Sequence, residues 1–167
     1  MSIAAVIVMG VSGCGKSTVG PLLAAKLGWP FEDGDAFHPE ANIAKQSAGI
    51  PLTDDDRWPW LASIAGRIAQ ARAVGTGVVI GCSALKRAYR DVLRAGHDDV
   101  RFVHLAGTME LIGTRQAARQ GHFMPTSLMA SQFATLEPPE GEPGVVTVGV
   151  EAGPDALAEA AHRALLG

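Results

Sequence analysis

The sequence predicts an α/β fold in which a parallel β-sheet is covered by helices on both faces. Its short apolar runs are nearly continuous rather than alternating, as strands buried on both faces require. Helical patterns separate these runs, so each strand would connect to the next through a crossover helix. A glycine-rich turn follows the first apolar run, at the carboxyl end of a strand, where such sheets bind ligands.

The predicted strands and helices alternate along the chain. We expect strands at residues 3–9, 30–31, 77–81, 100–105 and 145–150. We expect helices at residues 16–27, 53–74, 85–94, 109–119, 126–135 and 155–166. The second helix begins at Thr53, an N-cap followed by three aspartates that suit the positive helix end. Pro59 is expected to kink or restart it.

The composition indicates one globular domain, residues 1–167, with a sizeable core. The chain is 47% hydrophobic and 19% charged, and its net charge of −3 argues against a nucleic-acid partner. The apolar run at residues 3–9 is too short to span a membrane and lacks the flanks of a signal peptide. Cys14 and Cys82 fit free thiols in a reducing compartment. We therefore expect a cytoplasmic protein with no membrane partner.

The turn after the first strand matches the phosphate-binding P-loop pattern, two glycines at fixed spacing followed by lysine and a hydroxyl residue. Glycines permit positive φ and leave no Cβ against a phosphate, so successive N–H groups can form an anion-binding nest. Lys16 would reach the β- and γ-phosphates, and the Ser17 hydroxyl would help to hold Mg²⁺. The alternative is a glycine-rich turn without a ligand. The predicted nucleotide-binding residues here are Gly10, Val11, Ser12, Gly13, Cys14, Gly15, Lys16, Ser17 and Thr18.

Two aspartates and a histidine follow the second strand. Phosphoryl transfer needs a group that orients or deprotonates the attacking hydroxyl and acids that help to hold the metal. We assign Asp35 to the substrate hydroxyl and Asp33 to the metal. His38 either binds a polar substrate or caps the helix that follows Pro39. The alternative for the aspartates is an Asp-Gly turn with a solvated second carboxylate.

No acid follows the third strand, so a metal ion would depend on Ser17, the phosphates and the aspartate pair. Lys86 and Arg90 follow instead, spaced to share one helix face. Together with Arg57 they could surround an anionic substrate, because a guanidinium can bind a carboxylate through two hydrogen bonds. The alternative is a solvated basic face.

Arg115 and Arg119 lie one helical turn apart before a loop bounded by glycine and proline. This pattern is typical of a lid, at about residues 119–127, that brings cations to the transferring phosphoryl group and excludes water. The alternative is a solvated arginine pair. The Asn-Lys-x-Asp pattern that reads guanine is absent from the sequence, which favours ATP as the nucleotide.

Several sequence blocks closely resemble the bacterial-type gluconokinase family, in the family's order and over most of the chain. The most specific are Asp-Gly-Asp-x-x-His-Pro, Asp-Asp-Asp-Arg-x-Pro-Trp and Cys-Ser-Ala-Leu-Lys. The matching blocks are residues 10–18, 33–45, 51–61, 82–90, 121–123 and 132–138. The resemblance implies a three-layer P-loop kinase fold with a small lid, like nucleoside-monophosphate kinases and shikimate kinases. It also implies ATP- and Mg²⁺-dependent phosphorylation of D-gluconate to 6-phospho-D-gluconate, often by a homodimer.

The resemblance implies further roles for single residues. Asp33 and Asp35 match the aspartate pair that shikimate kinases place near Mg²⁺ and the substrate hydroxyl. Arg119 would be the lid arginine on the phosphates, and Arg115 and Pro138 would flank adenine. The predicted catalytic residues are Lys16, Asp35 and Arg119; the predicted substrate-binding residues are Asp35, His38, Arg57, Lys86 and Arg90; the predicted metal-binding residues are Ser17 and Asp33. The alternatives are a kinase for shikimate or another sugar acid, and a nucleotide-binding module without transfer activity.

Overall fold

A computed structural model describes residues 3–118 and 126–166 of the 167-residue chain. Its centre is a five-stranded sheet with the strand order β2-β3-β1-β4-β5, in which every neighbouring pair is parallel. The strands are β1 (Ala5–Met9), β2 (Phe31–Asp33), β3 (Val78–Gly81), β4 (Val100–Ala106) and β5 (Val145–Gly149). The predicted α/β fold with a parallel sheet is therefore confirmed.

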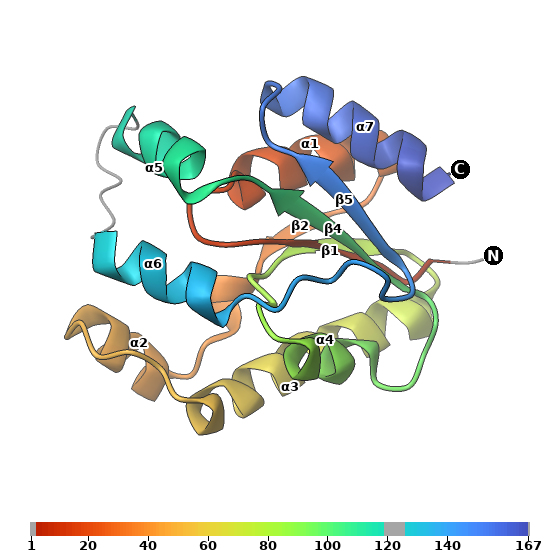
Figure 1. Cartoon of the computed structure of the whole chain (residues 1–167). Helices are drawn as coiled ribbons and strands as arrows, with labels where there is room; N and C mark the ends of the chain where they lie inside the picture. Colours follow the sequence, from red (N-terminus) through yellow and green to blue (C-terminus); the bar gives the residue numbers. More distant parts are fainter. Residues whose placement is uncertain (1–2, 119–125, 167) are drawn as a thin grey trace.

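Helices cover both faces of this sheet (Figure 1). The helices are α1 (Lys16–Leu27), α2 (Glu40–Ser47), α3 (Asp54–Val74), α4 (Arg87–Arg94), α5 (Met109–Ala118), α6 (Thr126–Thr135) and α7 (Pro154–Leu166), and Gly34–Phe37 forms the 3₁₀ helix η1. Figure 1 shows α1 and α7 on one face and α3 and α4 on the other. It places α2, α5 and α6 at the side towards which the strands point.

The strand β1 is buried along its whole length and supplies both halves of the core. Val6 and Val8 belong to the apolar cluster that includes residues of α1 and α7. Ile7 and Met9 belong to the cluster that includes residues of α3 and α4. Because successive residues of a strand face opposite sides, an uninterrupted apolar run is what this position demands. The loop after β1 therefore starts from a strand that is buried at every position.

Several element boundaries differ from the prediction by one or two residues. The second strand covers Phe31–Asp33 rather than residues 30–31, and α4 begins at Arg87 rather than at residue 85. The helix α3 is one continuous element, so it does not restart at Pro59. Its predicted start is confirmed by a capping box, in which Thr53 Oγ1 accepts from Asp56 N–H and Asp56 Oδ2 accepts from Thr53 N–H.

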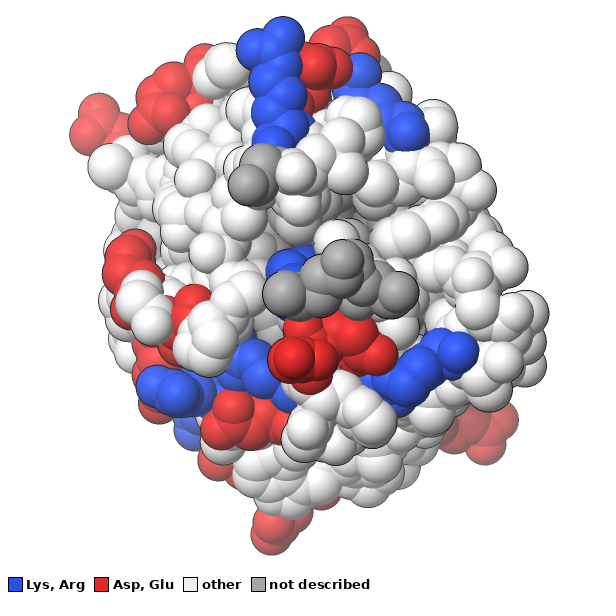
Figure 2. All heavy atoms as spheres, turned by 90° about the vertical axis from the view of Figure 1, so that its right-hand side faces the viewer, with Lys and Arg blue, Asp and Glu red and all other residues white. Residues whose placement is uncertain are grey.

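The surface on the side where the strands begin carries charges of both signs. Figure 2 shows acidic and basic side chains interspersed over this face, and neither sign forms a continuous patch among the residues described there. None of the helices in the described ranges is long and apolar enough to cross a membrane.

Candidate active site

The loop after β1 has the backbone that the P-loop pattern predicts. Gly10, Gly13 and Gly15 have φ values of 144°, 85° and 108°, in the region that side chains disfavour. A Cβ at Gly10 would also lie 2.7 Å from Cys14 Sγ and 2.9 Å from the Leu105 carbonyl oxygen. The first glycine is thus required both by its φ and by the close approach of the chain. The helix α1 begins directly after the loop, which adds its positive end to the anion site.

Lys16 folds back over this loop. Its Nζ donates to the carbonyl oxygens of Gly10 and Val11, at 2.9 and 3.0 Å. Ser17 is exposed in the first turn of α1, where its hydroxyl is accessible to a ligand. A contact that the sequence did not predict reaches the loop from α6, because Gln132 Oε1 accepts from the Ser12 N–H at 2.6 Å. The loop is therefore supported from a helix 120 residues further along the chain.

Asp33 and Asp35 lie where β2 runs into η1. Asp33 Oδ1 accepts from the Asp35 N–H at 2.9 Å and so caps η1. A Cβ at Gly34 would lie 2.3 Å from the Gly81 carbonyl oxygen, so only glycine lets η1 approach the end of β3 this closely. Partial burial and the neighbouring Asp33 charge raise the pKa of Asp35, against the opposing effects of Lys16 and His38. Sequence reasoning placed these groups together, and the structure does bring their charges within range of one another.

His38 is buried against Trp60. The two rings stack with their centroids 4.2 Å apart and an angle of 15° between their planes. The indole is itself anchored, because Trp60 Nε1 donates to the Gly34 carbonyl oxygen at 2.7 Å. Burial lowers the pKa of His38, Asp35 raises it and Arg57 lowers it, with a net decrease. This balance favours the neutral imidazole near neutral pH.

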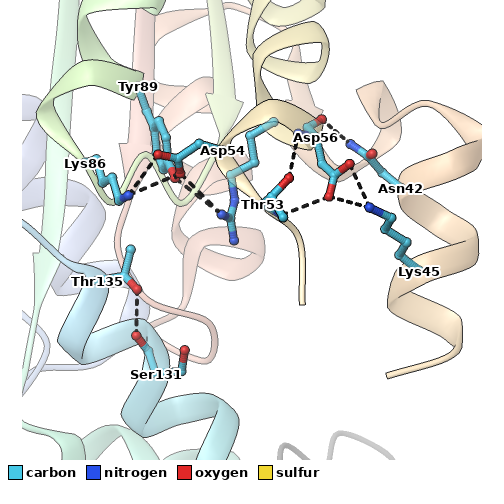
Figure 3. A network of polar contacts seen from close by, with 10 residues as sticks. Asn42, Lys45, Thr53, Asp54, Asp56, Lys86, Tyr89, Ser131 and Thr135 are labelled. Carbon is cyan, nitrogen blue, oxygen red and sulfur yellow. Dashed lines mark hydrogen bonds and ion pairs between the residues drawn. The ribbon is translucent and has the colours of Figure 1, made fainter. Parts of the chain in front are cut away.

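Arg57 and Lys86 meet at one carboxylate, in a group that we call the Asp54 cluster: Asp54, Arg57, Lys86 and Tyr89. Figure 3 labels Asp54, Lys86 and Tyr89 of this cluster. Lys86 Nζ lies 3.2 and 3.1 Å from the two Asp54 carboxylate oxygens, and Arg57 Nη1 lies 3.9 Å from Oδ1. The Tyr89 hydroxyl donates to the same Oδ1. Hydrogen bonds from Tyr89 and Lys86 lower the pKa of Asp54. Two cations against one carboxylate leave this cluster with one excess positive charge.

The predicted substrate-binding role of Arg90 is not supported by its surroundings. Its side chain has an exposed fraction of 0%, and its Nε and Nη2 donate to the Glu142 carboxylate. Nη1 donates to the carbonyl oxygens of Ala84 and Leu85, and Nη2 also donates to that of Glu137. These contacts use all five N–H donors of a guanidinium, so none is left for a substrate. Arg90 instead joins the loop after β3 to the segment after α6.

The remaining predicted residues lie around the same end of the sheet or outside the described ranges. Arg119 and most of the predicted lid, residues 119–127, lie outside the described residues. Arg115 belongs to α5, and Pro138 is exposed in the segment after α6. This segment also caps α4, because Glu137 Oε1 accepts from the Arg87 N–H at 2.9 Å. The roles of Arg115, Arg119 and Pro138 stay predictions.

Asp56 joins α3 to α2 at the edge of the site. Its carboxylate forms an ion pair with Lys45 of α2, with an N···O distance of 2.8 Å, and completes the capping box with Thr53 (Figure 3). Its carbonyl oxygen accepts from Asn42 Nδ2 at 2.8 Å. These contacts connect α2, which follows His38 and Pro39, to α3, which carries Asp54 and Arg57.

We expect Asp56→Asn to lower the free energy of unfolding at neutral pH and to flatten its loss in acid. Hydrogen bonds from Lys45 and Thr53 lower the pKa of Asp56 from 3.8 to about 2. The stability contributed by the ionised carboxylate is therefore complete above pH 3.8 and lost as the pH falls towards about 2. Urea unfolding across this pH range measures the effect. Asp55→Asn, in the same helical turn, is the matched control, and identical acid profiles for Asp56→Asn and the wild type would contradict the prediction.

Comparisons with known proteins indicate the family to which the chain belongs. A family model described as shikimate kinase matches residues 12–125. A gluconokinase from Gluconobacter oxydans (strain 621H) is 48% identical, over 92% of this chain and 86% of that protein. The chain belongs to the gluconokinase family. A probable gluconokinase from Rattus norvegicus is 46% identical, over 95% of this chain and 96% of its own length.

The backbone of this gluconokinase-family chain is similar to that of a solved structure. The crystal structure of a gluconokinase from Sinorhizobium meliloti 1021 superposes with a TM-score of 0.91 at 48% identity. The alignment covers 97% of this chain and 91% of that one. The predicted P-loop kinase fold and the predicted gluconokinase resemblance are both confirmed.

Proposed function

We propose that this member of the gluconokinase family transfers the γ-phosphoryl group of ATP to a hydroxyl of D-gluconate and forms 6-phospho-D-gluconate. The observation that carries the proposal is the juxtaposition of donor and acceptor groups. Lys16 of the phosphate-binding loop and His38 both lie within electrostatic range of Asp35. Arg57, which also acts on His38, belongs to the Asp54 cluster. These contacts support a phosphate site next to a site for a polar anion.

The donor half of the site fits ATP with Mg²⁺. The loop glycines leave no Cβ in the way of a phosphate, and Lys16 can exchange its two carbonyl partners for phosphate oxygens. Mg²⁺ keeps several waters and binds the phosphates together with one or two protein oxygens. Ser17 and Asp33 can provide these protein oxygens. The bound ion would neutralise charge on the phosphates. Arg119 from the lid is proposed to act on the same charge, with Arg115 and Pro138 beside adenine.

The acceptor half centres on Asp35. Its carboxylate accepts the proton of the attacking hydroxyl, while Lys16 stabilises the charge on the transferred phosphoryl oxygens. The excess positive charge of the Asp54 cluster matches the single carboxylate of gluconate, and we assign carboxylate binding to Lys86 and Arg57. His38 binds a hydroxyl of the same gluconate molecule. Arg90 supports the loop that carries Lys86 without touching the substrate.

The proposal includes cytoplasmic location and homodimeric assembly, both expected from the resemblance to the family. The excess of acidic over basic residues in the sequence is consistent with a small-molecule substrate rather than a nucleic acid.

An ADP-release assay with a panel of acids tests the proposed reaction. We expect ADP release that depends on D-gluconate, with formation of a phosphate monoester that ³¹P NMR detects. Release only with shikimate or another sugar acid would favour the alternative kinase. Release with none of the acids, in protein that binds ATP, would favour a nucleotide-binding module. Lys16→Ala provides the background, since it removes the phosphate-binding ammonium and leaves the acceptor residues in place.

A further inference from the structure

The side-chain amide of Asn42 lies between α3 and His38, and its orientation is determined by a backbone group. Asn42 and His38 are both buried, with exposed fractions of 3% and 9%. Asn42 Nδ2 lies 2.8 Å from the Asp56 carbonyl oxygen and 3.1 Å from His38 Nδ1. A carbonyl oxygen can only accept a hydrogen bond, so it must face the amide nitrogen of Asn42 and not the amide oxygen. The backbone of α3 therefore decides which way round this amide lies.

This orientation selects one tautomer of His38. The amide nitrogen carries two hydrogens, one for the Asp56 carbonyl oxygen and one for His38 Nδ1. Because Nδ1 accepts, the single proton of the neutral imidazole resides on Nε2. The ring is also held on its face by the stacked Trp60, with 4.2 Å between the centroids. Both the protonation and the orientation of His38 are therefore determined before a substrate binds.

The opposite edge of the ring is available to a ligand. Among the described residues no group forms a hydrogen bond with His38 Nε2. A buried Nε2 would then be a buried polar atom without a partner, and Nε2 is not such an atom, so it is accessible to solvent. The charged groups that act on His38 are Asp35 of η1 and Arg57 of α3. Asp35 is the residue assigned to accept the hydroxyl proton, so an N–H donor lies next to a carboxylate acceptor. A polyol presents both an oxygen acceptor and an O–H donor to such a pair.

We propose that Asn42 is a positioning residue that fixes His38 in the Nε2–H tautomer, so that His38 donates a hydrogen bond to a substrate hydroxyl and does not act as a base. The hydroxyl partner rests on the proposed function, whereas the tautomer does not. Asn42 itself acts only through His38, because both of its amide hydrogens are used inside the protein.

Long-range ¹H–¹⁵N NMR of the histidine side chains tests the tautomer directly. The His38 signals are assigned by their disappearance in His38→Gln. We expect Nε2 to be protonated and Nδ1 to be unprotonated in the wild type at neutral pH. In Asn42→Asp the new carboxylate can only accept, so it draws a proton onto Nδ1. We expect KM for gluconate to rise about tenfold in this variant, because one hydrogen bond to the substrate is lost or weakened, with little change in kcat or in KM for ATP.

Two further variants separate positioning from structural support. Lys45→Met loosens the same junction between α2 and α3, because Lys45 bonds the Asp56 carboxylate and does not touch His38. We expect it to lower Tm while leaving the tautomer and KM unchanged. Asn42→Ala, which introduces no charge, should give a mixture of His38 tautomers and a smaller rise in KM.

The results that overturn the proposal are specific. A proton on Nδ1 in the wild type would overturn it, as would an equal rise of KM in Lys45→Met and in the Asn42 variants. An unchanged KM in both Asn42 variants would also overturn it. If the wild type shows the Nε2–H tautomer but phosphorylates no gluconate, the proposed function fails while the assignment of the tautomer stands.

Discussion

Asp35→Asn is expected to lower kcat by about 10²- to 10⁴-fold while ATP affinity changes little. Asparagine has nearly the shape of aspartate and can still accept a hydrogen bond from a hydroxyl, but it cannot take up the proton. Among the described residues no hydrogen bond supports the Asp35 carboxylate, so the substitution removes no structural contact. The residue is also exposed at the open end of the site. The loss should therefore appear in the chemical step and not in folding.

Steady-state kinetics with gluconate, together with calorimetric titration of ATP, measures both parts of this prediction. Asp55→Asn is the matched control, because it makes the same change of charge at an exposed aspartate away from Lys16. Its kcat should stay within about twofold of the wild type, as expected for a surface substitution. Unchanged turnover in Asp35→Asn would remove Asp35 from the role of proton acceptor. A loss of ATP binding equal to the loss of kcat would instead place its role on the nucleotide side.

Local patterns predicted the parts of the fold that local forces determine. The run that forms β1 is apolar at every position because both faces of this strand are covered, and the loop glycines follow it directly in the sequence. The capping box joins Thr53 and Asp56, three residues apart, so it is visible in the sequence as well. The edge strand β2 was placed too early because it includes Glu32 and Asp33, which an apolar pattern does not detect. Glu32 is held by an ion pair with Arg67 of α3.

Contacts between distant segments decided the rest of the site. Lys86 and Arg90 share a helical spacing, and spacing alone does not show what covers each of them. Lys86 reaches the partly exposed Asp54, whereas Arg90 is covered by Glu142, which is 52 positions further along the chain. The three aspartates at the start of α3 suggested only complementarity to the helix dipole. In the structure Asp54 also binds Lys86, directly before α4, and Asp56 binds Lys45 of α2, and this second role needs the tertiary arrangement.

Arg90→Ala is expected to lower the free energy of unfolding by about 3 kcal/mol, because it leaves a buried carboxylate without its main partner. Glu142 keeps one hydrogen bond from Arg94, at 3.0 Å. The expected loss of stability therefore lies at the lower end of the range for broken buried ion pairs. The carbonyl oxygens of Ala84 and Glu137 lose the hydrogen bonds from Arg90 as well, whereas that of Leu85 keeps one from the Glu137 N–H. Urea unfolding at neutral pH measures the change. Arg163→Ala breaks only the exposed pair with Glu159, so it should cost less than about 1 kcal/mol.

The pH dependence of this effect distinguishes the buried ion pair from simple loss of packing. Burial raises the pKa of Glu142, but hydrogen bonds from Arg90 and Arg94 outweigh it, so the net pKa is lowered from 4.5. In the wild type this stability is present above pH 4.5 and is lost as the pH falls. Without Arg90, burial dominates and raises the pKa of Glu142, so this carboxylate is protonated more readily in the variant. The difference in free energy of unfolding between the wild type and Arg90→Ala should therefore become smaller in acid. A deficit that is constant with pH would indicate lost packing alone. If Arg90→Ala were as stable as the wild type but had a raised KM for gluconate, Arg90 would be a substrate-binding residue. Only a guanidinium that is not bonded to Glu142 could bind the substrate carboxylate.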